Sequence, residues 1–326
     1  MKKNHVLILS ITILIAGIIF FVKPKQNSQV TLAMTYIPNV QFAPWYVAKE
    51  KGFYSKEGLD VVFDYRMDID ALQLVATGKM DYAIAGGDQV LVARAQEIPV
   101  VYILSLYAKF PPSILAKVES GIKSPQDLKG KQIGLPLYGT NLLAVNAILK
   151  RAGVDAKDVK LVDIGYTQIQ SLVEDKVDAV VGFANNEPVK LKAMGYEVNE
   201  IHSWDYFSLV GHGLITGEKK IASDSDEVKK LVHASLKGLE YALAHPDETF
   251  EICLKYLPEL GEEQKEQERE VLKRSMALWE NDYTREHGVG YSDPRDWEDS
   301  QRLMMELGII EKETPIERVL NLSFLP

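Results

Sequence analysis

The sequence predicts an α/β protein of two similar lobes, each with a mostly parallel sheet flanked by helices. Short apolar runs alternate with helical segments from residue 30 to residue 195, which is typical of strand–helix–strand units. Residues 78–85 (GKMDYAIA) are echoed by residues 175–182 (DKVDAVVG), about one hundred positions later. This offset is too long for a solenoid repeat. The length of 326 residues allows two domains, so we expect two lobes whose strand-end loops face a shared cleft.

The first unit begins with a strand over 30–35 and continues into a helix from Pro44 to Gly52, because proline suits a first turn and glycine a C-terminal stop. The loop between them carries aromatic and amide side chains that suit a flat heterocycle at the carboxyl edge of a sheet. A position in the core is the alternative for its tryptophan, because aromatic residues dominate cores by area. The candidate ligand-binding residues of this loop are Tyr36, Asn39, Gln41, Phe42 and Trp45.

The remaining elements follow from apolar patterning and from glycine and proline stops. In the first half we expect strands over 59–65, 81–85 and 100–106, a helix over 69–77, and a helix to residue 96 that is capped by Asp88. In the second half we expect a strand after residue 131, strands over 159–164 and 177–182, and helices over 138–152, 168–175 and 188–194. Helices over 227–244, 246–256, 262–279 and 294–307 are expected to pack on the first lobe.

These elements divide the chain into three parts. Residues 1–28 form a signal or membrane anchor, residues 29–116 plus 214–326 form the first lobe, and residues 117–213 form the second. The chain would cross between the lobes near 113–117 and 209–216. Two connecting segments are a usual hinge in proteins that close on a ligand.

The N-terminal segment has the pattern of a targeting sequence. Two lysines after Met1 precede seventeen largely apolar residues, 6–22, as in a signal peptide or a short membrane span. No clear cleavage site follows. We therefore expect either an uncleaved anchor helix or a weakly cleaved signal, and an extracytoplasmic soluble part from about Gln29. A buried helix of a cytosolic domain is the alternative, which is less favoured because such helices are rarely apolar on all sides.

Composition argues against several other classes. The net charge of −9 and the lack of Lys and Arg clusters argue against a nucleic-acid partner. Cys253 is the single cysteine, which excludes an intramolecular disulfide, a cysteine-rich zinc site and an iron–sulfur cluster. The six histidines show no metal-ligand spacing, and His202 and His212 are interpreted as structural. We expect no metal, no cofactor and no catalytic residue.

Four segments carry a resemblance to a known family: residues 36–48 (YIPNVQFAPWYVA), 93–96 (ARAQ), 127–140 (DLKGKQIGLPLYGT) and 183–188 (FANNEP). From about residue 31 to residue 326, the chain resembles the SsuA/THI5-like substrate-binding proteins of ABC importers. Within that group it is most similar to the riboflavin-binding RibY type, and next to the ThiY type, which binds a formylaminopyrimidine. The resemblance implies a type II periplasmic-binding-protein fold, a ligand between the lobes, permease and ATPase partners, and a monomer.

The resemblance also implies pocket positions. Asn39, Tyr107, Tyr138 and Glu187 are carried over from it, and the internal echo adds Asp88 and Gln89. Gly139, Thr140 and Asn186 complete the expected ligand-binding set, because they lie in the corresponding strand-to-helix loops. Helix capping is the alternative role for both acidic residues.

The chemistry of these residues leaves the ligand open. A carboxylate would accept an N–H from a ring edge, and amides could donate to ring carbonyls, so either an isoalloxazine or an aminopyrimidine would fit. The number of aromatic residues near the loops favours the larger flavin. A thiamine-pyrimidine synthase is a weaker alternative, since the resemblance links that enzyme to a cysteine-rich segment and to a substrate histidine that residues 36–53 lack. An extracytoplasmic sensor would use the same pocket, but an importer component is simpler.

Overall fold

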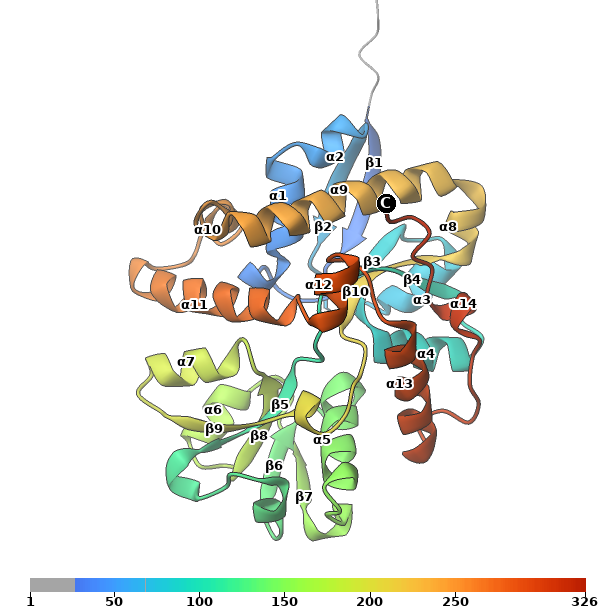
Figure 1. Cartoon of the computed structure of the whole chain (residues 1–326). Helices are drawn as coiled ribbons and strands as arrows, with labels where there is room; N and C mark the ends of the chain where they lie inside the picture. Colours follow the sequence, from blue (N-terminus) through green and yellow to red (C-terminus); the bar gives the residue numbers. More distant parts are fainter. Residues whose placement is uncertain (1–26, 68) are drawn as a thin grey trace, which may run out of the picture.

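The computed structural model describes residues 27–67 and 69–326, so the expected targeting segment lies almost entirely outside the described residues. Two five-stranded sheets form the centres of two lobes (Figure 1). The first sheet has the order β2-β1-β3-β10-β4 and comprises β1 (Ser28–Ala33), β2 (Leu59–Asp64), β3 (Tyr82–Gly86), β4 (Val100–Ser105) and β10 (His212–Gly217). The second has the order β7-β6-β8-β5-β9 and comprises β5 (Pro112–Lys117), β6 (Gln132–Leu135), β7 (Lys160–Asp163), β8 (Ala179–Phe183) and β9 (Val198–His202).

The two sheets have the same construction, as the internal echo predicted. β1 pairs in parallel with β2 and β3, and β6 pairs in parallel with β7 and β8. The fourth strand of each sheet runs antiparallel: β10 lies between β3 and β4, and β5 lies between β8 and β9. In each sheet four strands therefore run in one direction and one runs against them, in agreement with the mostly parallel sheets that the sequence pattern predicted.

Helices cover both sheets, and the C-terminal helices pack on the first lobe as expected (Figure 1). Most predicted ranges agree with the structure to within a few residues, whereas β9, α2, α8, α12 and α14 were not predicted. β9 is an edge strand that pairs with β5. Its sequence, VNEIH, lacks the regular apolar alternation by which a strand is recognised. The helices are α1 (Ala43–Glu50), α2 (Phe53–Lys56), α3 (Ala71–Thr77), α4 (Gly87–Ala95), α5 (Gly139–Arg151), α6 (Gln168–Val173), α7 (Glu187–Ala193), α8 (Glu218–Ser223), α9 (Ser225–Ala244), α10 (Pro246–Leu254), α11 (Glu262–Leu278), α12 (Asp282–His287), α13 (Pro294–Glu306) and α14 (Ile316–Val319).

The chain passes between the sheets through two segments, residues 106–111 and 203–211, which we call the crossing segments. They are hydrogen-bonded where the second one enters β10, because the backbone N–H groups of Leu106 and Tyr107 both donate to the His212 carbonyl, at 3.0 and 2.9 Å. The predicted boundary at residue 116 would assign β5 to the first lobe, although β5 pairs with β8 and β9 of the second sheet. We therefore propose lobes of 27–111 plus 212–326 and of 112–211.

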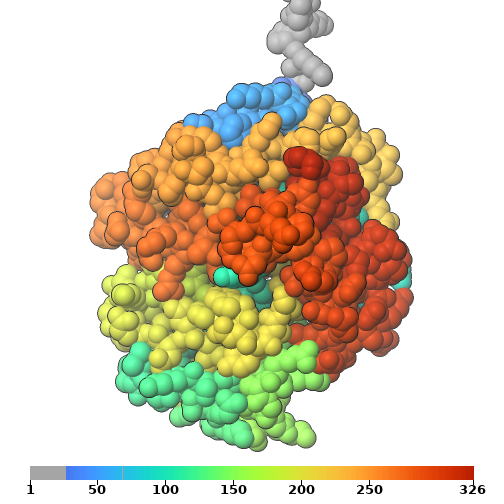
Figure 2. Space-filling view, in the orientation of Figure 1, coloured from blue at the N-terminus to red at the C-terminus, as the bar shows by residue number. Residues whose placement is uncertain are grey.

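The lobes also touch away from the crossing segments, and Figure 2 shows the C-terminal elements lying against the second lobe along a seam. Arg274 on α11 donates to the Ala184 carbonyl at 2.9 Å and pairs with Glu200 at 3.1 Å. Lys150 on α5 donates to the Glu306 carbonyl at the end of α13, at 2.7 Å. The structure thus has the two lobes closed against each other around the space between them.

Candidate ligand-binding cleft

A cavity of ≈ 610 Å³ lies between the lobes, beside the crossing segments. Its wall includes the first residues of α3, α5, α6 and α7 together with Gln89 from the first turn of α4. Parallel strands bring their carboxyl ends to one edge of each sheet, so the helices that follow them all begin at this edge. The volume is within the usual range of small-molecule sites.

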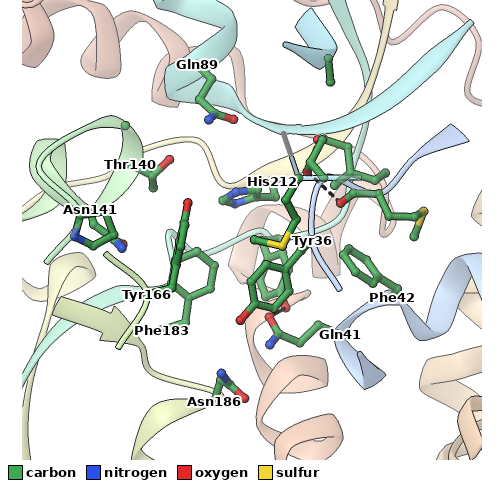
Figure 3. A pocket seen from close by; sticks show the side chains of 18 of the residues that line it. Tyr36, Gln41, Phe42, Gln89, Thr140, Asn141, Tyr166, Phe183, Asn186 and His212 are labelled. Atoms are coloured by element: carbon green, nitrogen blue, oxygen red, sulfur yellow. Dashed lines mark hydrogen bonds between the residues drawn. The ribbon is translucent and has the colours of Figure 1, made fainter. Parts of the chain in front are cut away.

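The structure places ten of the thirteen predicted ligand-binding residues on this cavity. They come from both lobes and from the first crossing segment, and Figure 3 shows several of them around the open space. The ten residues are Tyr36, Gln41, Phe42, Gln89, Tyr107, Tyr138, Gly139, Thr140, Asn186 and Glu187.

Asn39, Trp45 and Asp88 do not line the cavity. Trp45 is 1% exposed and belongs to the core of the first lobe, in agreement with the alternative given above for it. The Asn39 side chain accepts the Gln41 N–H at 2.9 Å and so caps the 3₁₀ turn Val40–Phe42. This cap sets the position of Gln41 and Phe42, so Asn39 shapes the wall of the cavity without forming it.

Tyr107 connects the two lobes at the cavity wall. Its hydroxyl donates to Gln41 Oε1 at 3.3 Å and accepts from Asn185 Nδ2 at 3.2 Å. Asn185 Nδ2 also donates to Ser275 Oγ at 2.7 Å. Burial raises the pKa of Tyr107 to about 12, so the phenol keeps its proton and remains a donor at neutral pH. This chain of bonds fixes Gln41 relative to the second lobe.

Glu187 is the first residue of α7 and combines a structural bond with a place on the cavity wall. Its Oε2 accepts the Phe183 N–H at 2.7 Å, and its Oε1 accepts from Asn186 Nδ2 at 3.0 Å. Burial raises the pKa of the Glu187 carboxyl, and these donors oppose the shift. The carboxylate therefore closes the 183–187 loop and still has lone pairs for a ligand donor.

Asp88 lies in the first turn of α4, whereas the predicted cap position is occupied by Gly86. It is 4% exposed, and its Oδ2 accepts from the Thr140 hydroxyl of α5 at 2.9 Å. Its Oδ1 has no hydrogen-bond partner among the described residues. Asp88 therefore links the two lobes directly behind Thr140.

Replacing Asp88 by asparagine is expected to change how stability depends on pH. Burial raises the pKa of Asp88 from 3.8 to about 6, so the unfolded chain releases this proton at a lower pH than the folded chain. The folded state therefore loses stability as pH rises from about 4 to about 6, by up to about 3 kcal/mol. Asparagine cannot ionise, so Asp88→Asn should gain stability relative to the parent over this interval.

Urea unfolding of the parent and of Asp88→Asn at pH 4, 5, 6 and 7 measures this gain. Asp155→Asn is the control, because Asp155 is an exposed cap of the turn Ala156–Asp158 in the second lobe. The control should follow the pH dependence of the parent. A stability difference between Asp88→Asn and the parent that stays constant from pH 4 to pH 7 would contradict the prediction.

Several cavity residues were not predicted from the sequence, among them Asn141, Tyr166, Phe183 and His212. Tyr166 follows β7 and precedes α6, so the strand-to-helix rule applied to this loop would have found it. Its ring centroid is 6.5 Å from those of Tyr36 and Tyr138, and the three tyrosines form an aromatic wall shared by both lobes. Tyr138 and Tyr166 are 60% and 55% exposed, so their faces are open to a ligand.

His212 was interpreted as a structural residue and instead lies on the cavity wall (Figure 3). Its Nδ1 atom is buried without a partner among the described residues. Burial lowers the pKa of His212 to about 4, so the ring is neutral at pH 7. Its place at the start of β10, where the chain re-enters the first sheet, carries no local sequence signal.

Comparison with known proteins identifies a family whose sequence model matches this chain. The family model described as NMT1/THI5 like matches residues 39–249. A protein named riboflavin-binding protein RibY from Chloroflexus aurantiacus is 40% identical, over 91% of this chain and 86% of its own length. A formylaminopyrimidine-binding protein from Halalkalibacterium halodurans is 30% identical, over 69% of each chain.

More distant proteins include one named 4-amino-5-hydroxymethyl-2-methylpyrimidine phosphate synthase from Legionella pneumophila, which is 24% identical over 92% of this chain and 93% of its own length. Among solved structures, the periplasmic aliphatic sulphonate binding protein SsuA from Escherichia coli superimposes with a TM-score of 0.70 at 13% identity, covering 92% of this chain and 94% of that one. That likeness confirms the predicted two-lobed binding-protein fold.

Proposed function

The chain belongs to the NMT1/THI5-like family, and from this premise we propose that it is the extracytoplasmic solute-binding component of an ABC importer. It would capture a flat heterocyclic vitamin between its lobes and deliver it to permease and ATPase subunits. The observation that carries the proposal is the cavity between the lobes, which both lobes line with tyrosines and hydrogen-bonding side chains. A cavity between two hinged lobes can enclose a solute and release it.

Riboflavin is the ligand that we propose first. The relative with 40% identity, which is named as a riboflavin-binding protein, supports this choice over nearly the whole chain. The wall formed by Tyr36, Tyr138 and Tyr166 offers stacking surfaces for a broad ring system. Glu187 could accept an imide N–H, and Gln41 or Asn186 could donate to ring carbonyls.

Binding to the purified full chain, kept in a mild detergent, should quench the fluorescence of riboflavin, because the isoalloxazine would stack on a tyrosine face. The measurement is a fluorescence titration at micromolar flavin, with isothermal calorimetry on the same sample. Heat and quenching with an aminopyrimidine but not with riboflavin would reverse the order of the two ligands.

A pyrimidine precursor of thiamine is the second candidate, supported by the relative with 30% identity. The same carboxylate and amides could bind an aminopyrimidine, although that ring would leave more of the aromatic wall uncovered. We further propose that the chain is not an enzyme, which the binding-protein names of its two more similar relatives support. Anchoring through residues 1–28 and a monomeric state are also proposals.

The proposed cycle depends on the contacts that join the lobes. In the closed arrangement Thr140 bonds to Asp88 and Asn185 bonds to Tyr107 across the cleft. Opening about the crossing segments would break these bonds and give the ligand access to the aromatic wall. Closure around the ligand would exclude water and strengthen its hydrogen bonds.

A further inference from the structure

The charged side chains on the described part of the cavity wall are carboxylates. Asp70 and Glu187 line it, and none of the described lining residues is lysine or arginine. The imidazole of His212 adds no positive charge, because burial lowers its pKa to about 4. The side chains that a ligand would meet are therefore neutral or negative at pH 7.

The helices that begin at the cavity would ordinarily favour an anion, because a helix N-terminus presents free N–H groups and a partial positive charge. Here the protein's own carboxylates lie at these ends. Asp70 caps α3 and accepts the Gln73 N–H at 3.0 Å, and Glu187 is the first residue of α7.

The two longer helices at the cavity share one carboxylate. Asp88 is in the first turn of α4 and accepts from Thr140 in the first turn of α5. A ligand anion placed near either helix end would lie close to this buried carboxylate. The favourable potential of these helix ends is therefore already offset within the protein.

Other polar atoms on the wall also suit a ligand that donates hydrogen bonds. Asn186 is 5% exposed and lines the cavity, and its Oδ1 has no partner among the described residues. An amide oxygen and two carboxylates accept hydrogen bonds from N–H and O–H groups. A phosphate dianion has no such donor to offer them.

We propose that the cleft selects an uncharged heterocycle and rejects its phosphate ester, an inference that deepens the proposed function and rests on it. A vitamin that occurs outside the cell as a phosphate monoester would then need hydrolysis before capture. In that reaction water adds to phosphorus, the P–O bond to the vitamin breaks, and the free alcohol and inorganic phosphate are released. For a vitamin that occurs in this form, phosphate-ester hydrolysis on the outer side of the membrane is therefore the reaction class that must supply the free ligand.

The test compares two matched pairs of ligands on the full chain in detergent: riboflavin with riboflavin 5′-phosphate, and hydroxymethylpyrimidine with its phosphate. The phosphate ester of whichever vitamin binds should bind at least about a hundredfold more weakly, since like charges placed together in a site are strongly unfavourable. The ratio should shrink as salt is added, because ions screen charges that are partly exposed. Equal binding of ester and free vitamin would overturn the inference and leave the proposed function standing, whereas no binding of any of the four would overturn both.

A variant pair tests whether charge causes the rejection. Asp70→Asn removes a carboxylate from the cavity wall while keeping a side chain that caps helices well, so the ratio between ester and vitamin should fall about threefold or more at low salt. Asp155→Asn makes the same change at an exposed cap away from the cavity, and its ratio should equal that of the parent. A ratio that neither variant alters would point to steric exclusion and overturn the charge argument.

Discussion

Gly211→Ala is expected to lower the free energy of unfolding by about 2–3 kcal/mol, the upper part of the usual range for overpacking. Gly211 ends the second crossing segment, and a Cβ atom placed there would lie 2.4 Å from the Tyr107 carbonyl oxygen and 2.6 Å from Tyr107 Cβ. The obstacle includes backbone, so it cannot rotate away as a side chain would. The Gly211 carbonyl also accepts the Gly87 N–H at 3.0 Å, which limits movement of the segment itself.

Urea unfolding followed by far-UV circular dichroism measures this loss. Gly261→Ala is the matched control: its added Cβ would meet only the carboxylate end of Glu263, an exposed side chain that can move. The control should lose about 1 kcal/mol or less, the usual cost of alanine at a helix cap. Equal losses in the two variants would show that the crossing segments do not need glycine for their close approach.

Glu187→Ala is expected to weaken riboflavin binding by about tenfold or more, since loss of a charged hydrogen bond is worth about 1.5–3 kcal/mol. Glu187 lies on the cavity wall, and its carboxylate also holds the Phe183 N–H and the Asn186 amide. Removing it would take away a ligand acceptor and would free Asn186 to move. Fluorescence titration of the variant gives the change in affinity.

Two further variants separate these effects. In Glu187→Gln the amide oxygen can still accept the Phe183 N–H, so the 183–187 loop should persist while the charged acceptor is lost. The riboflavin affinity of Glu187→Gln should therefore lie between those of the parent and Glu187→Ala. Glu262→Ala removes an acidic residue from the first turn of α11, where its side chain is 86% exposed and does not line the cavity. Its riboflavin affinity should equal that of the parent. Unchanged affinity in Glu187→Ala would restrict Glu187 to the support of its loop.

Much of this architecture could be predicted because the local signals agree with the fold. The helix from Pro44 and its stop at Gly52 were expected, and Gly52 has the positive φ of +69° that such a stop requires. The two similar sheets were expected from the echo between residues 78–85 and 175–182. Strand-to-helix loops then indicated part of the cavity wall, because the geometry of parallel sheets brings such loops together.

The remaining features depend on contacts between distant parts of the chain. Tyr107 bonds to Gln41, 66 positions earlier in the chain, and to Asn185, 78 positions later, and no local spacing in the sequence encodes these contacts. Trp45 lies near the start of a helix, where an aromatic side chain can either pack in the core or contact a ligand. Only the packing of distant segments around it shows that it belongs to the core of the first lobe. His212 lies on the cavity because β10, which follows the second lobe in the chain, inserts between β3 and β4 of the first sheet.

The late insertion of β10 also sets an order of assembly during synthesis. All five strands of the second sheet lie between residues 112 and 202, whereas the first sheet lacks its fourth strand until residues 212–217 have been made. A growing chain can thus complete its second sheet before its first, and until then β3 and β4 each have an edge that lacks its β10 partner. Fragments that end before residue 212 should accordingly be prone to aggregate, because exposed strand edges recruit other chains.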